Sequence, residues 1–177
     1  MKIVILSGSP HRHGTTARLV DCFAAGAAEA GHEVTRFDTA FLNVRPCAAC
    51  DACQAESGSC VFRDDMVTIG DALAEADCIA LATPVYYYGI NAQLKTVIDR
   101  FYAIEKRIRR NQKTVFITAM ADDARDSVNA VNDSYRAIIR WLGWRDGGIL
   151  NAFACSAPKD LEGTDYEARA FELGKRI

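Results

Sequence analysis

The chain has 177 residues, a formal net charge of −2, 50% hydrophobic residues and 25% charged residues. This length corresponds to about one domain, and the balance excludes a disordered or fibrous chain. The small net charge argues against a nucleic-acid partner, which would require a basic stripe. The one unusual feature of the composition is the number of cysteines, which is seven.

Apolar runs of strand length alternate with helical patterns along the chain. Continuous apolar runs predict strands over residues 2–6, 33–37, 78–82, 114–119 and 148–154. Apolar residues at helical spacing predict helices over residues 15–30, 64–76, 91–108, 127–142 and 166–175. The first run is too short for a signal peptide, and no run approaches the ~20 residues of a membrane span. We therefore expect no membrane partner and a cytoplasmic protein, whose thiols stay reduced.

Strands that are apolar along their whole length are covered on both faces, which indicates a parallel sheet between two helical layers. Right-handed crossovers then leave few topologies. The sequence predicts an α/β fold with a doubly wound five-stranded parallel sheet, flavodoxin-like, in three α/β/α layers. No repeat or linker divides residues 1–177, so we expect a single domain. Residues 39–63 contain no clear element and four of the cysteines, and form its cysteine-bearing loop.

The loop after the first strand leads directly into a helix, whose N-terminus presents free N–H groups and suits a phosphate. The side chains available for an anion there are Ser9, His11, Arg12, His13, Thr15 and Thr16. A P-loop is excluded because five residues, rather than four, separate Gly8 from Gly14, and Thr15 replaces the lysine. The alternative is a plain turn whose hydroxyls cap the helix.

The loop after the third strand combines a stiffening Pro84 with three consecutive tyrosines. In doubly wound folds this loop and the first one meet at the carboxyl edge of the sheet. Planar side chains there suit a flat heteroaromatic ring. The alternative is an aromatic cluster that packs against a helix end.

Three segments together resemble the NAD(P)H-dependent FMN reductase family of flavodoxin-like proteins. They are GSP (8–10) with GTT (14–16), TPVYYYG (83–89), and QLK (93–95) with IDR (98–100). The resemblance implies an FMN-dependent oxidoreductase that passes electrons from NAD(P)H to a small acceptor: a quinone, an azo or nitro compound, a flavin or a metal ion. The flavin would carry the chemistry, so no catalytic side chain is assigned. The resemblance also implies a homo-oligomer, a dimer or tetramer.

The resemblance also assigns the cofactor contacts by position. In the first loop, Ser9, His11, Thr15 and Thr16 would contact the FMN phosphate, with Arg12 as a neighbouring positive charge. In the second loop, the contacts with the ring or ribityl chain would come from Pro84, Val85, Tyr86, Tyr87 and Gly89. A third loop would lie around residues 119–123. For Lys95, Asp99 and Arg100 we expect a structural role, such as a subunit contact.

The cysteines of the 39–63 loop form a C-x2-C-x2-C-x6-C pattern, made of Cys47, Cys50, Cys53 and Cys60. This density suits an iron–sulfur centre better than zinc, whose ligands come as separated pairs. With the DDM segment at 64–66, the pattern resembles the iron–sulfur flavoproteins and implies a [4Fe-4S] cluster. The alternative is a loop of reduced thiols near the flavin or a dimer contact. Cys22, Cys78 and Cys155 are interpreted as core residues.

Three functions therefore remain open at the sequence level. The first is an NAD(P)H-dependent flavin oxidoreductase. The second is an iron–sulfur flavoprotein that transfers electrons between protein partners. The third is a non-enzymatic redox- or metal-sensing thiol protein on the same scaffold.

Overall fold

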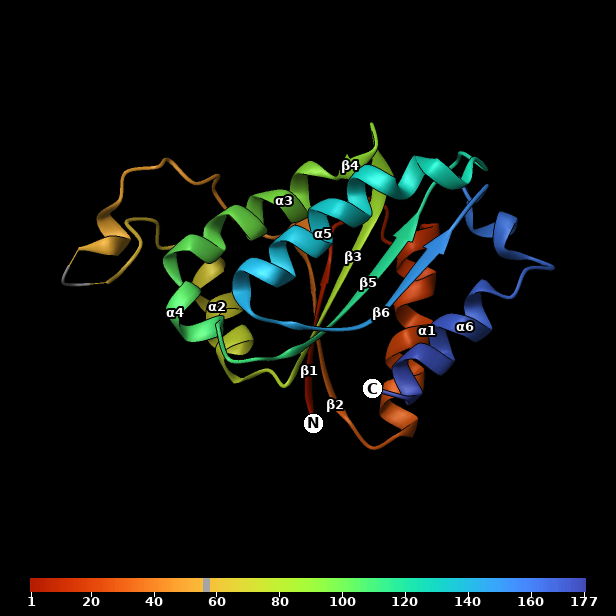
Figure 1. Ribbon diagram of the computed structural model, residues 1–177, viewed down its shortest axis with the longest axis horizontal. Helices are drawn as coiled ribbons and strands as arrows, with labels where there is room; N and C mark the ends of the chain where they lie inside the picture. The colour runs from red at the N-terminus through yellow and green to blue at the C-terminus, as the bar shows by residue number, and fades with distance from the viewer. Residues whose placement is uncertain (56–57) are drawn as a thin grey trace.

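The computed structural model describes residues 1–55 and 58–177. Its sheet has five parallel strands in the order β2-β1-β3-β5-β6 (Figure 1). The strands are β1 (Lys2–Ser7), β2 (Glu33–Asp38), β3 (Cys78–Tyr86), β5 (Lys113–Ala119) and β6 (Arg145–Ala152). A two-residue strand, β4 (Gly89–Ile90), pairs antiparallel with the end of β3. This strand order is one of the two common doubly wound orders and confirms the predicted flavodoxin-like fold class.

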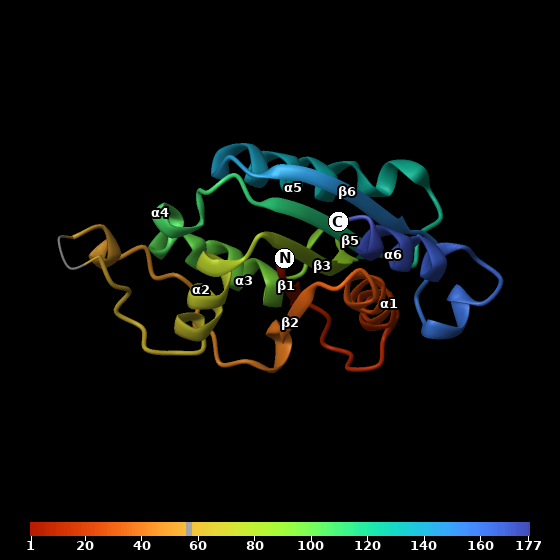
Figure 2. The same cartoon turned by 90° about the horizontal axis from the view of Figure 1, so that it is seen from below.

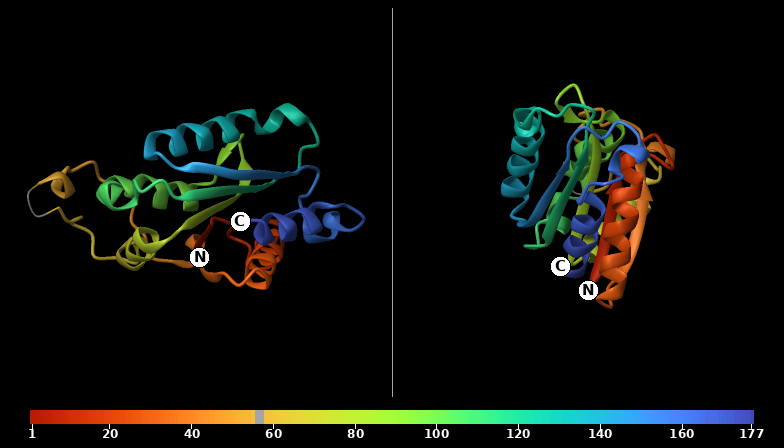
Figure 3. Two further views of the ribbon diagram at one scale, coloured as in Figure 1. Left: turned by 60° about the horizontal axis from the view of Figure 1, so that its bottom comes forward. Right: turned by 90° about the vertical axis from the view of Figure 1, so that its right-hand side faces the viewer.

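Helices cover both faces of the sheet, as the edge-on view in Figure 3 shows. The helices are α1 (Thr15–Glu29), α2 (Met66–Glu75), α3 (Ala92–Asp99), α4 (Glu105–Ile108), α5 (Asn129–Leu142) and α6 (Tyr166–Lys175). Short 3₁₀ turns are η1 (Thr39–Phe41), η2 (Ala52–Gln54), η3 (Arg100–Ala103), η4 (Arg125–Val128) and η5 (Pro158–Leu161). The three predicted layers are therefore present.

Alternate residues of β1 belong to two separate apolar clusters, one on each face of the sheet. Val4 and Leu6 belong to the cluster under α2, α3 and α5. Ile3 and Ile5 belong to the cluster under α1 and α6. All four side chains are 4% exposed or less. Burial on both faces explains why the strand is apolar at every position rather than at alternate ones.

The helix predicted over residues 91–108 is broken in the structure. It consists of α3, the 3₁₀ turn η3 and the short α4. Phe101 and Ile108 stay buried after the break, in the same cluster as Leu94 and Val97. The apolar spacing continues through the break, so the sequence pattern could not show it.

Two strand boundaries also differ from the prediction. β3 runs to Tyr86 rather than to residue 82, because Val85 and Tyr86 pair with β4. β6 covers Arg145–Ala152 rather than 148–154, and its register with β5 shifts between Thr114 and Val115. The shift accommodates two glycines that interrupt the apolar pattern at the start of the strand.

The predicted cysteine-bearing loop, residues 39–63, has only η1 and η2 as regular structure, and its residues 56–57 lie outside the described part of the chain. The described parts of this segment extend away from the sheet beside α2, α3 and α4 (Figures 1 and 2). None of the described helices is long and apolar enough to span a membrane.

Candidate cofactor site and cysteine loop

A cavity of about 220 Å³ lies at the carboxyl edge of the sheet, where the loops after β1, β3, β5 and β6 converge. It is lined by Ser9, His11, Gly14, Thr15, Thr16, Pro84, Val85, Tyr86, Ala119, Met120, Ala121, Cys155 and Ser156. The loops after β1 and β3 therefore lie together at this edge, as predicted. The edge cavity, as we call it, contains seven of the ten residues predicted to contact a cofactor.

The first loop places the Thr15 hydroxyl at the N-terminus of α1, where it has no hydrogen-bond partner among the described residues. Thr15 is the first residue of this 15-residue helix and is 6% exposed. Its Oγ1 is buried and has no hydrogen-bond partner. A buried polar atom is normally paired, so an orphan at a helix N-terminus indicates a place for a ligand. The Ser9 hydroxyl instead accepts a hydrogen bond from the His11 N–H at 3.2 Å and shapes the turn.

Arg12 lies outside the edge cavity. Its guanidinium stacks over the Phe41 ring, 3.7 Å from the ring centroid. This contact holds the outer side of the first loop against η1. A cation–π contact of this kind is worth about 0.5–1 kcal/mol at an exposed position.

Asn91 connects two of the loops that form the edge cavity, those after β1 and β3. It is 2% exposed and lies between β4 and α3. Its Nδ2 donates to the Gly8 carbonyl, its Oδ1 accepts from the Thr83 hydroxyl at 3.0 Å, and its backbone N–H donates to the same hydroxyl at 3.0 Å. A Cβ on Gly8 would lie 2.2 Å from Asn91 Oδ1. The glycine therefore permits the close approach that fixes the first loop against the third strand.

The three tyrosines are divided between two sites. Tyr86 lines the edge cavity, whereas Tyr87 and Tyr88 line a neighbouring hollow of about 290 Å³. Tyr87 is fully exposed, and both Tyr87 and Tyr88 have positive φ, 46° and 63°. They form a two-residue hairpin loop in the conformation that Asn-Gly usually takes, which is strained for tyrosine. Gly89 lines neither space.

The hollow beside the edge cavity shares three lining residues with that cavity: Val85, Met120 and Ala121. Its charged wall is Asp122, whose carboxylate accepts hydrogen bonds from the Ser127 hydroxyl and the Ala124 N–H. These bonds, that from Ser127 first, hold the pKa of Asp122 below its ordinary value. The hollow therefore has a fixed negative charge beside the place expected for a planar ring.

Cys155 was interpreted from the sequence as a core residue, and it is buried, but it also lines the edge cavity. Its thiol donates to the Phe153 carbonyl at 3.0 Å. Burial raises its pKa, so the thiol stays protonated at neutral pH. Cys155 and Ser156 follow β6, and no motif marks them in the sequence. Only the sheet topology shows that this loop reaches the site.

Two aspartates anchor the base of the cysteine loop. The Asp64 carboxylate accepts the Arg45 N–H at 2.9 Å, and the Asp65 carboxylate accepts the Asn43 N–H at 2.7 Å. Asp64 is also paired with Arg100 at 2.8 Å, and both side chains are nearly inaccessible. Arg100 thus has the structural role expected of it but lies too deep for a surface contact, whereas Lys95 and Asp99 form an exposed pair at 2.6 Å.

All four loop cysteines line one small cavity beside Phe62, Arg100 and Tyr102. Cys47 and Cys50 are exposed, and Cys53 and Cys60 are half-buried. Among residues 1–55 and 58–177, no three Cys, His, Asp or Glu side chains are gathered closely enough for a single metal ion. The cavity encloses about 20 Å³, roughly the space of one water molecule. A larger group would require the exposed side of the loop to open.

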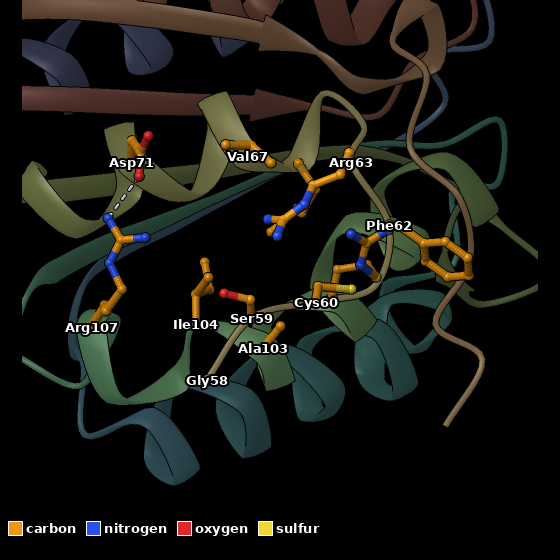
Figure 4. Close-up of a pocket in the computed structure, with 12 residues that line it drawn as sticks. Gly58, Ser59, Cys60, Phe62, Arg63, Val67, Asp71, Ala103, Ile104 and Arg107 are labelled. Atoms are coloured by element: carbon orange, nitrogen blue, oxygen red, sulfur yellow. Dashed lines mark hydrogen bonds and ion pairs between the residues drawn. The ribbon is translucent and has the colours of Figure 1, made fainter. Parts of the chain in front are cut away.

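A second hollow, of about 150 Å³, lies on the other side of Cys60 (Figure 4). Arg63 and Arg107 line it, and Arg107 is paired with Asp71 at 2.8 Å. The residues that line both the cysteine cavity and this basic hollow are Cys60, Phe62, Arg100 and Ala103.

A known family and several known proteins resemble this chain in sequence. The sequence model of the NADPH-dependent FMN reductase family matches residues 1–148. An iron–sulfur flavoprotein of Archaeoglobus fulgidus is 37% identical over 100 residues, which are 56% of this chain and 45% of that protein. An iron–sulfur flavoprotein of Methanocaldococcus jannaschii is 40% identical over 100 residues, 56% of this chain and 51% of that protein. The matched part thus spans about half the length of these relatives.

Among solved structures, an NAD(P)H:quinone oxidoreductase from Methanothermobacter marburgensis superposes with a TM-score of 0.77. The superposition covers 99% of this chain and 94% of the other, at 20% sequence identity. At that identity the likeness establishes the shared fold.

Proposed function

Since the chain belongs to the NADPH-dependent FMN reductase family, we propose that it is an oxidoreductase that holds FMN in the edge cavity. Electrons would come from NAD(P)H and pass to a small acceptor such as a quinone, an azo or nitro compound, a free flavin or a metal ion. The observation that carries the proposal is the unpaired Thr15 hydroxyl, buried at the N-terminus of α1 within that cavity.

The residues present fit FMN. Thr15 and Thr16, with Ser9 and His11 beside them, would hold the phosphate, where the helix dipole also favours negative charge. When bound, FMN supplies the two-electron chemistry.

The ring would lie between the second and third loops. Pro84, Val85 and Tyr86 offer one wall, and Met120 and Ala121 offer the other. The Asn91 hydrogen bonds keep the first and second loops in place before anything binds. The hollow at Tyr87 and Asp122 is open beside this position and would admit a flat acceptor.

The purified chain, stripped of any cofactor and titrated with FMN, tests the proposal. Quenching of flavin fluorescence should saturate at one FMN per chain. Anaerobic addition of NADH or NADPH should bleach the flavin bands, and a quinone should restore them. A chain that takes up no FMN would refute the proposal.

A second candidate is an iron–sulfur flavoprotein, which transfers electrons between the flavin, a cluster held by the cysteine loop and protein partners. The specific observation in its favour is that Cys47, Cys50, Cys53 and Cys60 line one cavity. Four thiolates, one per iron, are the donor set of a [4Fe-4S] cluster, so the chemistry of the residues fits the group. The names of the curated relatives also support it.

Anaerobic purification separates the two candidates. Iron and acid-labile sulfide in equal amounts, about four of each per chain, would favour the second. Flavin without iron would eliminate the cluster and leave the reductase. Cys22→Ser serves as a control, because Cys22 lies on α1, far from the loop in sequence, and its loss should leave the iron content unchanged.

The proposal includes a homo-oligomer, a dimer or tetramer, in the cytoplasm. Large aromatic side chains are exposed at Tyr87, Tyr102 and Trp141. All seven cysteines are free thiols, which suits a reducing compartment. Light scattering on the FMN-loaded protein tests the assembly, and a strictly monomeric mass would contradict it.

A further inference from the structure

Arg100 is a buried cation that leaves one donor unused. Its side chain is 2% exposed. Nη1 donates to the Arg45 carbonyl and to Asp64 Oδ2, both at 2.8 Å, and Nη2 donates to Asp64 Oδ1 at 3.1 Å. Nε is buried and has no hydrogen-bond partner. Leaving a buried donor unpaired costs about 1–3 kcal/mol, so such a group is expected to have a use.

The surroundings of Arg100 indicate what that use is. The residue lines the cavity that the four cysteines line. Cys60 lines this cavity too, and both Cys60 and Arg100 also line the second hollow beside it. The centroid of the Phe62 ring lies 5.2 Å from the guanidinium carbon.

The other charged groups at the cavity do not compete for Nε. Asp99 is paired with Lys95 on the exposed side of α3. Asp51 accepts a hydrogen bond from the Tyr102 hydroxyl at 3.3 Å. Asp64 already engages the two terminal nitrogens of Arg100. The sulfurs of the four cysteines line the same cavity, and among them Cys60 also lines the second hollow that Arg100 lines.

We propose that Arg100 is a positioning and tuning residue for an iron–sulfur cluster: its terminal nitrogens fix the base of the cysteine loop, and its Nε–H donates to sulfur at Cys60. The inference rests on the second function proposed above. Reduction adds negative charge to a cluster, and a hydrogen bond or a nearby cation stabilises that charge. Arg100 therefore raises the reduction potential of the cluster.

Arg100→Lys tests this role, because it keeps a cation beside Asp64 but removes the Nε–H donor and the planar fork. The matched control is Lys95→Ala, which removes an exposed cation from α3. Redox titration followed by the electron paramagnetic resonance of the reduced cluster measures the midpoint potential. We expect a more negative potential in Arg100→Lys, at unchanged iron and sulfide content, and the wild-type potential in Lys95→Ala.

The outcomes separate the tuning role from the cluster itself. If the wild-type protein contains no iron, both the cluster and the role of Arg100 are refuted. A cluster with the wild-type potential in Arg100→Lys overturns the role alone. If that variant does not fold, wild-type protein with ¹⁵N only in arginine guanidinium groups decides the question. Pulsed resonance of its reduced cluster should show coupling to ¹⁵N, and absence of coupling overturns the role.

Discussion

The edge cavity and the cysteine loop are held in place by different contacts. The cavity walls follow directly from four neighbouring parallel strands, and Asn91 ties two of them together through buried hydrogen bonds. The cysteine loop is anchored at its base by Asp64 and Asp65, and the cysteines lie beyond that anchor. We infer that the sheet preorganises the cavity, whereas the outer part of the loop is held by exposed contacts such as the Tyr102–Asp51 hydrogen bond at 3.3 Å.

Both regions contain non-glycine residues with positive φ. Ala49 and Asp51, on either side of Cys50, both have positive φ, 50° and 54°. Such conformations cost about 1 kcal/mol or more for each non-glycine residue. Around the edge cavity, positive φ values occur at Tyr87 and Tyr88 in the hairpin loop and at Ala154, directly before the lining residue Cys155.

The largest effect is expected at the anchor of the cysteine loop. Asp64→Ala leaves the buried Arg100 without its partner and should reduce the free energy of unfolding by about 3–5 kcal/mol. Asp99→Ala removes an exposed partner of Lys95 and should cost less than about 1 kcal/mol. Urea unfolding followed by circular dichroism compares the two. Equal losses would show that the anchor is no stronger than a surface pair.

The same anchor predicts a pH dependence. Burial alone would raise the pKa of Asp64, but the Arg100 hydrogen bond and then the Arg45 N–H lower it below its ordinary 3.8. A carboxyl with a lowered folded pKa stabilises the fold above its unfolded pKa and loses that contribution as pH falls through the folded value. Stability should therefore decrease below about pH 4. Asp64→Asn should show a shallower decrease, and an identical slope would contradict the assignment.

The next largest effect is expected from a glycine-to-alanine substitution, made once in each of the two regions. Gly8→Ala places a Cβ against Asn91 and Leu94, so unfolding stability should fall by about 3 kcal/mol and FMN affinity should fall with it. Gly58→Ala has open space around it and costs only its positive φ, about 1 kcal/mol. Thermal unfolding with and without FMN measures both. Loss of FMN binding in Gly58→Ala would show that the regions are not independent.

A smaller effect tests the phosphate position. Thr15→Val removes the unpaired hydroxyl and should leave the unliganded protein at least as stable, while FMN affinity falls about 10- to 100-fold, as for a lost hydrogen bond to a charged group. Thr114→Val is the matched control, because its hydroxyl donates to the Ile79 carbonyl at the opposite end of β5. The control should lose stability and keep its FMN affinity. If Thr15→Val instead keeps its FMN affinity and Thr114→Val loses it, Thr15 does not bind the phosphate.

The smallest effect concerns the hairpin beside the cavity. Tyr87→Asn with Tyr88→Gly should raise the free energy of unfolding by up to about 1 kcal/mol, because these residues accept positive φ. FMN affinity should change less than about twofold, since neither tyrosine lines the edge cavity. A tenfold loss would instead extend the flavin site into the neighbouring hollow and assign Tyr87 to it.

Much of the fold could be predicted because burial on both faces leaves a direct trace in the sequence. Continuous apolar runs identified the five parallel strands, and Pro84 with its tyrosines marked the loop that meets the first one. The break after Asp99 left no trace, because its apolar residues keep their spacing through η3.

The parts of the site that were missed depend on contacts distant in sequence. Asn91 looks like an ordinary helix cap until its amide reaches Gly8, which lies 83 residues earlier. Cys155 joins the edge cavity only through the position of β6 in the sheet. The burial of Arg100 depends on Asp64, which comes from another element. Periodicity and local motifs carry no information on such pairings.

The most direct test of the central claim, an FMN-dependent oxidoreductase built on the edge cavity, is anaerobic reduction of the FMN-loaded protein by NADH and NADPH. Wild-type protein should bind one FMN, and at least one nicotinamide should bleach it within seconds. Thr15→Val should show the same bleaching only at higher FMN concentration. A protein that binds FMN but stays oxidised with both nicotinamides would contradict the reductase, and failure to bind FMN would contradict the site itself.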